Sequence, residues 1–227
     1  MTGLVVQAPA GTKGFDADCV IDAEGARAWY AKGFRFAMRY VPRKSVGAHD
    51  LTAIEVQRLH DAGLAVGVVQ HVGLEGWLPT PEKGRAYGWY AAISSEDAQI
   101  PLGVHLWCDV EGIMPGTPAE MVIAYVNQWA GQVKSAGYRA GAYIGYGSIL
   151  TAEQLYHRLA VDAYWLAYNG DKDQIPAVRG VCMRQHELPN AGRPAGYQNL
   201  DGIDENVVQL DHLGGLPWLY APLGWTP

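Results

Sequence analysis

Two carboxylates stand two residues apart at the end of an apolar run, Gly103-Val-His-Leu-Trp-Cys-Asp-Val-Glu111. Successive side chains of a β-strand point to opposite faces, so we expect Asp109 and Glu111 to share a face with Trp107 and Cys108 to take the other. Cleavage of a glycosidic bond needs two carboxyl groups in one cleft, one protonated and one ionised. The pair is therefore the strongest candidate for a catalytic centre.

The spacing of Asp109 and Glu111 also bears on their protonation. Two anions on neighbouring same-face positions repel each other, and this repulsion raises the pKa of one of them, so that a proton donor is available near neutral pH. Burying two carboxylates costs folding free energy unless they are solvated, paired or used. A structural role is the alternative, and we favour catalysis.

Polar side chains also stand near the ends of most other predicted strands, where a barrel of parallel strands has its active site. Asp16 and Asp18 repeat the two-residue spacing, although Asp16 could instead be a helix N-cap or the partner of Arg39 in a buried ion pair. His71 and His186 are more typical of hydrogen-bonding residues than of acid–base catalysts. The candidate site residues are Asp16, Asp18, Arg39, His71, Asp109, Glu111, Tyr143, Tyr168, Gln185 and Asp204.

The elements that must position these residues follow from the alternation of short apolar runs with longer helical segments. Helices are predicted over 22–32, 51–62, 81–95, 118–135 and 151–159, the first two followed by Gly33 and Gly63, as helix C-termini prefer. Strands are predicted over 14–20, 35–41, 65–72, 104–110, 140–146, 163–168, 181–186 and 206–210. This pattern predicts a single (β/α)8 barrel of TIM type.

The last two crossovers, 169–180 and 188–205, are rich in Gly, Pro and Asn and predict loops. The alternative fold is an open doubly wound sheet, but that fold should show a glycine-rich phosphate loop, and no GxGxxG or Walker pattern is present. No internal repeat or linker is visible. We therefore expect one domain over residues 1–227, with a core of about 14–210 and a C-terminal tail, 211–227, packed over the barrel.

Composition excludes several classes of partner. A net charge of -6 without a run of Lys and Arg argues against nucleic acid, and no segment approaches the roughly 20 apolar residues that span a bilayer. Cys19, Cys108 and Cys182 each lie in a predicted strand and no zinc-type spacing occurs, so we expect buried free thiols, no metal and no cofactor. The N-terminus lacks signal-peptide features. We expect a soluble monomer that reaches a cell wall only through phage lysis or a secretion machine.

Ordered motifs extend over about residues 14–206. Gly14-Phe-Asp16, Arg39-Tyr40 and Asp109-Val-Glu111 belong to strands one, two and four; the later motifs are Gly137-Tyr-Arg-Ala-Gly-Ala-Tyr143, Tyr164-Trp-Leu-Ala-Tyr168, Arg184-Gln-His186 and Ile203-Asp-Glu-Asn206. In this order the chain resembles the family 25 glycoside hydrolases. It is closer still to their relatives known only as glycoside-hydrolase-like domains.

The resemblance implies a barrel muramidase that cleaves the β-1,4 bond between N-acetylmuramic acid and N-acetylglucosamine in peptidoglycan. Glu111 would match the general acid and Asp109 the partner that tunes it or positions the substrate acetamido group. Asp16 and Asp204 would match two further acids that line the cleft. The chain departs from the family at Asp18, where Ser is frequent, and at the ends of strands three and seven, which lack family aromatics.

Two other functions fit the residues. A non-catalytic glycan-binding barrel would keep the cleft without the chemistry, and the altered ends of strands three and seven favour it. A metal-dependent hydrolase built on His71, His105, Asp109 and Glu111 lacks the usual His-x-His or His-x-x-Glu spacing on one element. We therefore predict a glycoside hydrolase acting on peptidoglycan or a related amino-sugar glycan.

Overall fold

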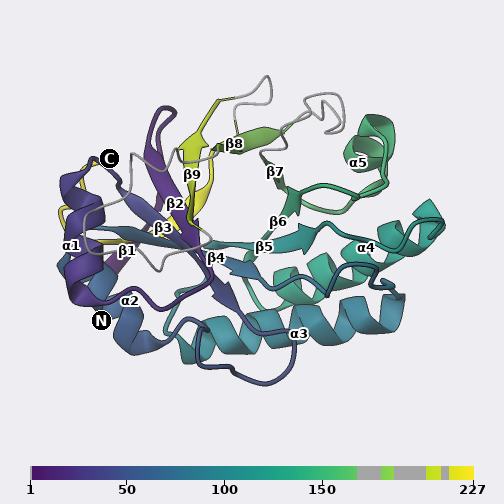
Figure 1. Ribbon diagram of the computed structural model, residues 1–227, viewed down its shortest axis with the longest axis horizontal. Coiled ribbons are helices and arrows are strands. Elements are labelled where there is room, and N and C mark those ends of the chain that lie inside the picture. Colours follow the sequence, from purple (N-terminus) through teal and green to yellow (C-terminus); the bar gives the residue numbers. More distant parts are fainter. Residues whose placement is uncertain (1, 168–179, 187–202, 211–214) are drawn as a thin grey trace.

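Eight strands close into a barrel in the computed structural model, which describes residues 2–167, 180–186, 203–210 and 215–227 (Figure 1). The ring closes where β4 pairs with β5, with Val68 opposite Leu106. Side chains along each strand alternate between the barrel interior and its outer surface. The strands are β2 (Lys13–Ala17), β3 (Phe36–Val41), β4 (Ala65–Gln70), β5 (His105–Val110), β6 (Arg139–Ile144), β7 (Ala163–Leu166), β8 (Val181–His186) and β9 (Ile203–Val208).

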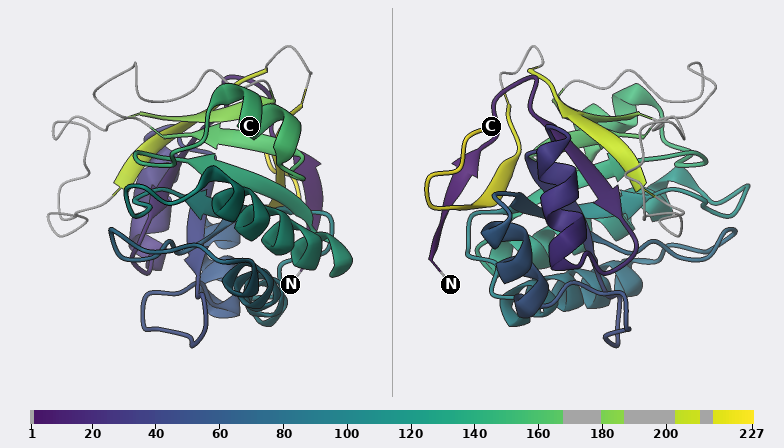
Figure 2. Two further views of the ribbon diagram at one scale, coloured as in Figure 1. Left: turned by 90° about the vertical axis from the view of Figure 1, so that its right-hand side faces the viewer. Right: turned by 60° about the vertical axis from the view of Figure 1, so that its left-hand side comes forward.

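Helices within the described residues cover the outside of the barrel, and all of them lie where the sequence predicts helices (Figures 1 and 2). None of these helices is long and apolar enough to cross a bilayer. On α3, Gly88 allows close contact with α4, because a Cβ there would lie 2.5 Å from the Trp129 carbonyl oxygen. The helices are α1 (Ala23–Ala31), α2 (Ala53–Asp61), α3 (Pro81–Asp97), α4 (Ala119–Ser135) and α5 (Ala152–Arg158).

The direction of β9 departs from the pattern of an all-parallel barrel. It pairs antiparallel with both β2 and β8, whereas the other barrel strands pair in parallel. Antiparallel neighbours need no helical crossover between them. Residues 168–179 and 187–202 lie outside the described residues, so the loops predicted there stay predictions. The predicted loop over 188–205 is wrong at its end, because residues 203–205 already pair with β2 as the start of β9. The predicted TIM-type barrel is confirmed, with this reversal in its last strand.

Two strands near the chain termini were not predicted. β1 (Gly3–Gln7) and β10 (Trp218–Pro222) form an antiparallel pair, and β10 joins the barrel where Tyr220 stands opposite Val66 of β4 (Figure 2). The Trp218 main-chain N–H donates to His105 Nδ1 at 2.9 Å, and Trp225 Nε1 donates to the Arg35 carbonyl at 2.8 Å. Hydrogen bonds therefore join the C-terminal segment to the barrel.

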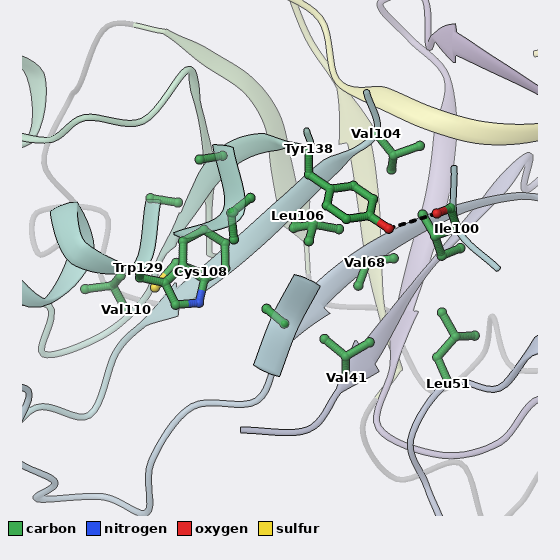
Figure 3. Close-up of a cluster of buried hydrophobic side chains, with 14 of the residues drawn as sticks. Val41, Leu51, Val68, Ile100, Val104, Leu106, Cys108, Val110, Trp129 and Tyr138 are labelled. Atoms are coloured by element: carbon green, nitrogen blue, oxygen red, sulfur yellow. Dashed lines mark hydrogen bonds between the residues drawn. The ribbon is translucent and has the colours of Figure 1, made fainter. Parts of the chain in front are cut away.

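Two apolar layers result from the strand alternation. The inner layer fills the barrel and includes Trp107 and Trp165. The outer layer lies between strands and helices, and there Leu106 and Cys108 of β5 belong to the same cluster as Trp129 of α4 (Figure 3). This confirms that Cys108 faces away from Asp109 and Glu111.

The cysteines differ in burial. Cys108 and Cys182 are buried, as predicted, whereas Cys19 is only partly buried. The prediction for Cys19 is wrong because β2 ends at Ala17, so that Cys19 lies in the following bend and not in a strand.

Packing around Trp107 gives a test of the barrel interior. A Cβ on Gly141 of β6 would lie 2.7 Å from Trp107 Cδ2, inside a layer that has no room to relax, so Gly141→Ala should lower the free energy of unfolding by about 1–3 kcal/mol. Gly131→Ala on α4 is the matched control, because a Cβ there meets nothing within 4 Å and should stabilise the helix by up to about 1 kcal/mol. Urea unfolding of both variants measures the difference, and equal effects would contradict this packing.

Candidate active site

Three of the predicted carboxylates, Asp18, Asp109 and Glu111, line a groove at the carboxyl ends of the strands. The groove has a volume of about 840 Å³, and its walls come from residues 42–50, which follow β3, and residues 71–74, which follow β4. Asp109 and Glu111 line it at the end of β5. This is the end of a parallel barrel at which catalytic residues are expected.

Asp109 faces the barrel interior beside Tyr143, its neighbour in register on β6. Its side chain is buried, and its Oδ1 has no hydrogen-bond partner among the described residues. Burial raises the pKa of Asp109 well above its usual range, the charges of Glu111 and Asp16 raise it further, and the Arg43 charge opposes the shift. Asp109 therefore favours its protonated form in the absence of a ligand.

Glu111 comes directly after β5 and is held by its main chain. Its carbonyl accepts a hydrogen bond of 2.8 Å from Trp77 Nε1. Its side chain packs on Gly145, where a Cβ would lie 2.7 Å from Glu111 Cβ, so that only glycine leaves room for this conformation. Burial raises the pKa of the Glu111 carboxyl, and the Asp204 charge adds to that effect. The Glu111 side chain is less enclosed than that of Asp109.

Asp16 is the centre of a hydrogen-bond network at the mouth of the barrel. Its Oδ2 accepts from Gln185 Nε2 at 2.9 Å and from Asn206 Nδ2 at 2.8 Å, and the Tyr40 hydroxyl lies 3.5 Å from its Oδ1. The Tyr143 hydroxyl donates to Gln185 Oε1 at 2.9 Å and extends the network toward β6. Burial raises the pKa of Asp16 to about 7, although these donors oppose the shift.

Asp204 joins the other acids through strand register. It stands directly opposite Asp16 in the antiparallel β2–β9 ladder, and opposite residues of such a ladder share a face. Its charge contributes to the raised pKa values of both Asp16 and Glu111. The structure therefore brings together the four acids that the sequence predicted.

His71 and Asp18 lie in the groove wall. His71 Nε2 is 2.9 Å from Asp50 Oδ1 and 3.7 Å from Asp18 Oδ1, and its ring stacks on Tyr40 with the centroids 4.8 Å apart. Asp18 is exposed, because it follows β2 and is not part of the strand. Tyr168, the remaining aromatic candidate, lies outside the described residues.

Arg39 is not in the groove, and its predicted role there is wrong. It is fully buried on the outer side of β3, where its Nε donates to Glu55 Oε1 of α2 at 2.7 Å and its guanidinium also reaches the carbonyls of Ala17 and His49. Adjacent strand residues face opposite sides, and Tyr40 takes the inward position. The alternative ion pair between Arg39 and Asp16 is likewise absent from the described contacts.

His105 also lies away from the acids. It is the first residue of β5, at the strand end opposite Glu111, and its Nδ1 accepts the hydrogen bond from Trp218. Its burial lowers the pKa to about 3, so it stays neutral. A metal site that combines His105 with Glu111 would need both ends of one strand.

Several residues of the site were not predicted from the sequence. Asn206 is fully buried and donates a hydrogen bond to Asp16. It was not predicted as a site residue, although it shares a strand face with Asp204. Arg43 and Lys44 in the groove wall were not singled out, because a loop that follows a strand carries no periodicity. The signal for all three was their position immediately beside a strand end or a predicted acid.

Solved structures with the same fold come from bacteria and fungi. The Tat-secreted protein Rv2525c of Mycobacterium tuberculosis, in complex with L-tartrate, superposes with a TM-score of 0.65 at 19% identity over 91% of this chain and 99% of that one. A muramidase from Trichobolus zukalii gives 0.58 at 15% identity over 87% and 93%. The lysozyme from Streptomyces coelicolor gives 0.57 at 14% identity over 91% and 95%.

The sequence comparisons define the family. No curated protein matches the chain. Residues 27–208 match the model of the Rv2525c-like, glycoside hydrolase-like domain, and this range contains Asp109, Glu111 and Asp204. The predicted resemblance to glycoside-hydrolase-like relatives of the lysozymes is confirmed, and the chain belongs to the Rv2525c-like, glycoside hydrolase-like domain family.

Proposed function

We propose that this glycoside hydrolase-like domain cleaves β-1,4 glycosidic bonds of bacterial peptidoglycan. The observation that carries the proposal is the pair Asp109 and Glu111, which line one groove and have pKa values raised by burial. A carboxyl group that keeps its proton near neutral pH is the general acid that glycoside hydrolysis requires. The fold shared with a muramidase and a lysozyme supports the choice of glycan.

Glu111 is the general acid in this proposal. It protonates the leaving glycosidic oxygen, because it is less enclosed than Asp109 while burial still favours its protonated form. Asp109 then positions the 2-acetamido group that attacks the anomeric carbon. Asp16 and Asp204 lie opposite each other in the β2–β9 ladder. Gln185 holds Asp16, and Tyr143 in turn holds Gln185.

A second candidate is a glycan-binding barrel without catalysis. The specific observation in its favour is that no Lys or Arg within the described residues forms an ion pair with Asp16, Asp109 or Glu111. All three have raised pKa values, whereas hydrolysis also needs an ionised carboxylate or an oriented acetamido group. Binding of an amino-sugar oligomer without release of fragments would favour this candidate.

Replacing Glu111 with Gln tests the proposed acid. Glu111→Gln keeps the size and hydrogen-bonding capacity of the side chain but removes the transferable proton, so release of reducing ends from purified peptidoglycan should fall at least 100-fold. Glu75→Gln is the matched control, because Glu75 lies in the neighbouring loop 71–76 and is absent from the lining of the groove. An unchanged rate in a folded Glu111→Gln variant would contradict the assignment.

The raised pKa of Asp16 predicts a pH-dependent cost in stability. Between the unfolded value of 3.8 and the folded value of about 7, the folded state holds a proton that the unfolded state has released, so stability falls as the pH rises through this range. Asp16→Asn keeps an acceptor for Gln185 and Asn206 but cannot ionise. Its free energy of unfolding should exceed that of the wild type by an amount that grows between pH 4 and pH 8, to a few kcal/mol at most. Thermal unfolding across this range measures the difference, and a gap that is constant with pH would contradict the account.

A further inference from the structure

The wall of the groove carries positive charge close to the catalytic acids. Arg43 and Lys44 both line the groove, on the loop of residues 42–50 that follows β3. This placement is unexpected in a chain whose net charge is -6. Two cations in the wall of a groove are able to bind a negatively charged group.

No carboxylate of the described residues forms an ion pair with Arg43 or Lys44. The Arg43 guanidinium lies over the ring of Tyr87, 5.8 Å from its centroid, and this contact holds the side chain beside the groove without neutralising it. Lys44 is exposed to solvent. Both cations therefore remain available to a ligand.

The acids that share the groove are already engaged in other ways. Asp50 is bound to His71 Nε2 and to the Gly47 main-chain N–H, and Asp18 lies 3.7 Å from His71. Burial raises the pKa values of Asp109 and Glu111, and the Arg43 charge opposes this shift at Asp109. Arg43 and Lys44 thus face the groove without an ion-pair partner among the described residues.

We propose that Arg43 and Lys44 form an anion subsite of the groove, which binds a carboxylate of the glycan that lies across Asp109 and Glu111. The inference rests on the proposed function and assigns two residues that recognise the carboxylates of its substrate. Guanidinium and ammonium groups donate charge-assisted hydrogen bonds to carboxylates, and a neutral amino-sugar polymer offers no such group. Peptidoglycan offers two kinds: the lactyl carboxylate of a bare muramic acid and the free carboxylates of its stem peptide.

Binding of matched sugars to a folded Glu111→Gln protein tests the subsite without turnover. The probes are chitotetraose, which is neutral, the disaccharide N-acetylglucosaminyl-N-acetylmuramic acid, which has a free lactyl carboxylate, and its tetrapeptide derivative, which has stem carboxylates only. Adding Arg43→Gln and Lys44→Gln should weaken calorimetric binding of at least one acidic probe about tenfold and leave chitotetraose unchanged. Whichever acidic probe is weakened identifies the carboxylate.

A control with the same change in charge guards against a general electrostatic effect. Arg27→Gln with Arg58→Gln removes two cations from the outer surfaces of α1 and α2 and should leave all three affinities unchanged. Equal weakening of neutral and acidic probes, equal weakening by the control pair, or no binding of either acidic probe would overturn the subsite.

The two proposals fail separately. Selective loss of the acidic probe in a protein whose wild type releases no reducing ends would support the subsite and contradict hydrolysis. Release of reducing ends by a protein whose Arg43 and Lys44 variants bind all probes normally would overturn the subsite and leave hydrolysis in place.

Discussion

The hydrogen bonds that converge on Asp16 are the interaction on which the mouth of the barrel depends. Through its carboxylate, Asp16 of β2 contacts Gln185 of β8 and Asn206 of β9, and Tyr143 of β6 joins through Gln185. The antiparallel β9 makes this possible, because its register sets Asp204 opposite Asp16 of β2 and Asn206 opposite Gln185 of β8. The buried Asp16 carboxyl group thus holds the polar side chains of β6, β8 and β9 together at the mouth of the barrel.

Burial of the carboxyl groups raises their pKa values and also costs folding free energy when they ionise. Removing carboxyl groups from water favours their protonated forms, so Asp16, Asp109 and Glu111 all have raised pKa values. Behind β3, Arg39 and Glu55 form a buried ion pair at 2.7 Å, whereas Asp16, Asp109 and Glu111 have no ion-pair partner among the described residues. In the groove the cations are set apart on the loop of residues 42–50, where they can meet a ligand.

The elements of this fold were predictable because their signals are local. Apolar runs and helix-capping residues predicted the eight barrel strands and the helices, and alternation along β5 placed Asp109 and Cys108 on opposite faces. The direction of β9 was not predictable, since strand direction depends on its partners. β1 and β10 were missed because each is short and is stabilised by pairing with strands far away in the sequence, β1 with β10 and β10 also with β4.

The residues of the candidate site were likewise predictable only where their signals are local. Asp16, Asp109, Glu111 and Asp204 were identified from types and spacing together with a family resemblance, and the barrel brings them together. Arg39 was misassigned because the dipeptide Arg39-Tyr40 does not reveal which residue faces inward; Glu55, its buried partner, lies on the next helix. Arg43 and Lys44 went unnoticed because their relation to the acids arises only when the loop after β3 folds beside β5.

The measurement that most directly tests the central claim is the identity of the products. Purified peptidoglycan would be incubated with the protein in water enriched in oxygen-18, and the soluble fragments would be analysed by mass spectrometry. The account predicts fragments whose new reducing ends are N-acetylmuramic acid carrying the heavy oxygen at the anomeric carbon. Fragments with peptide-bond cleavage only, or no new reducing ends from a folded protein that binds the polymer, would contradict it.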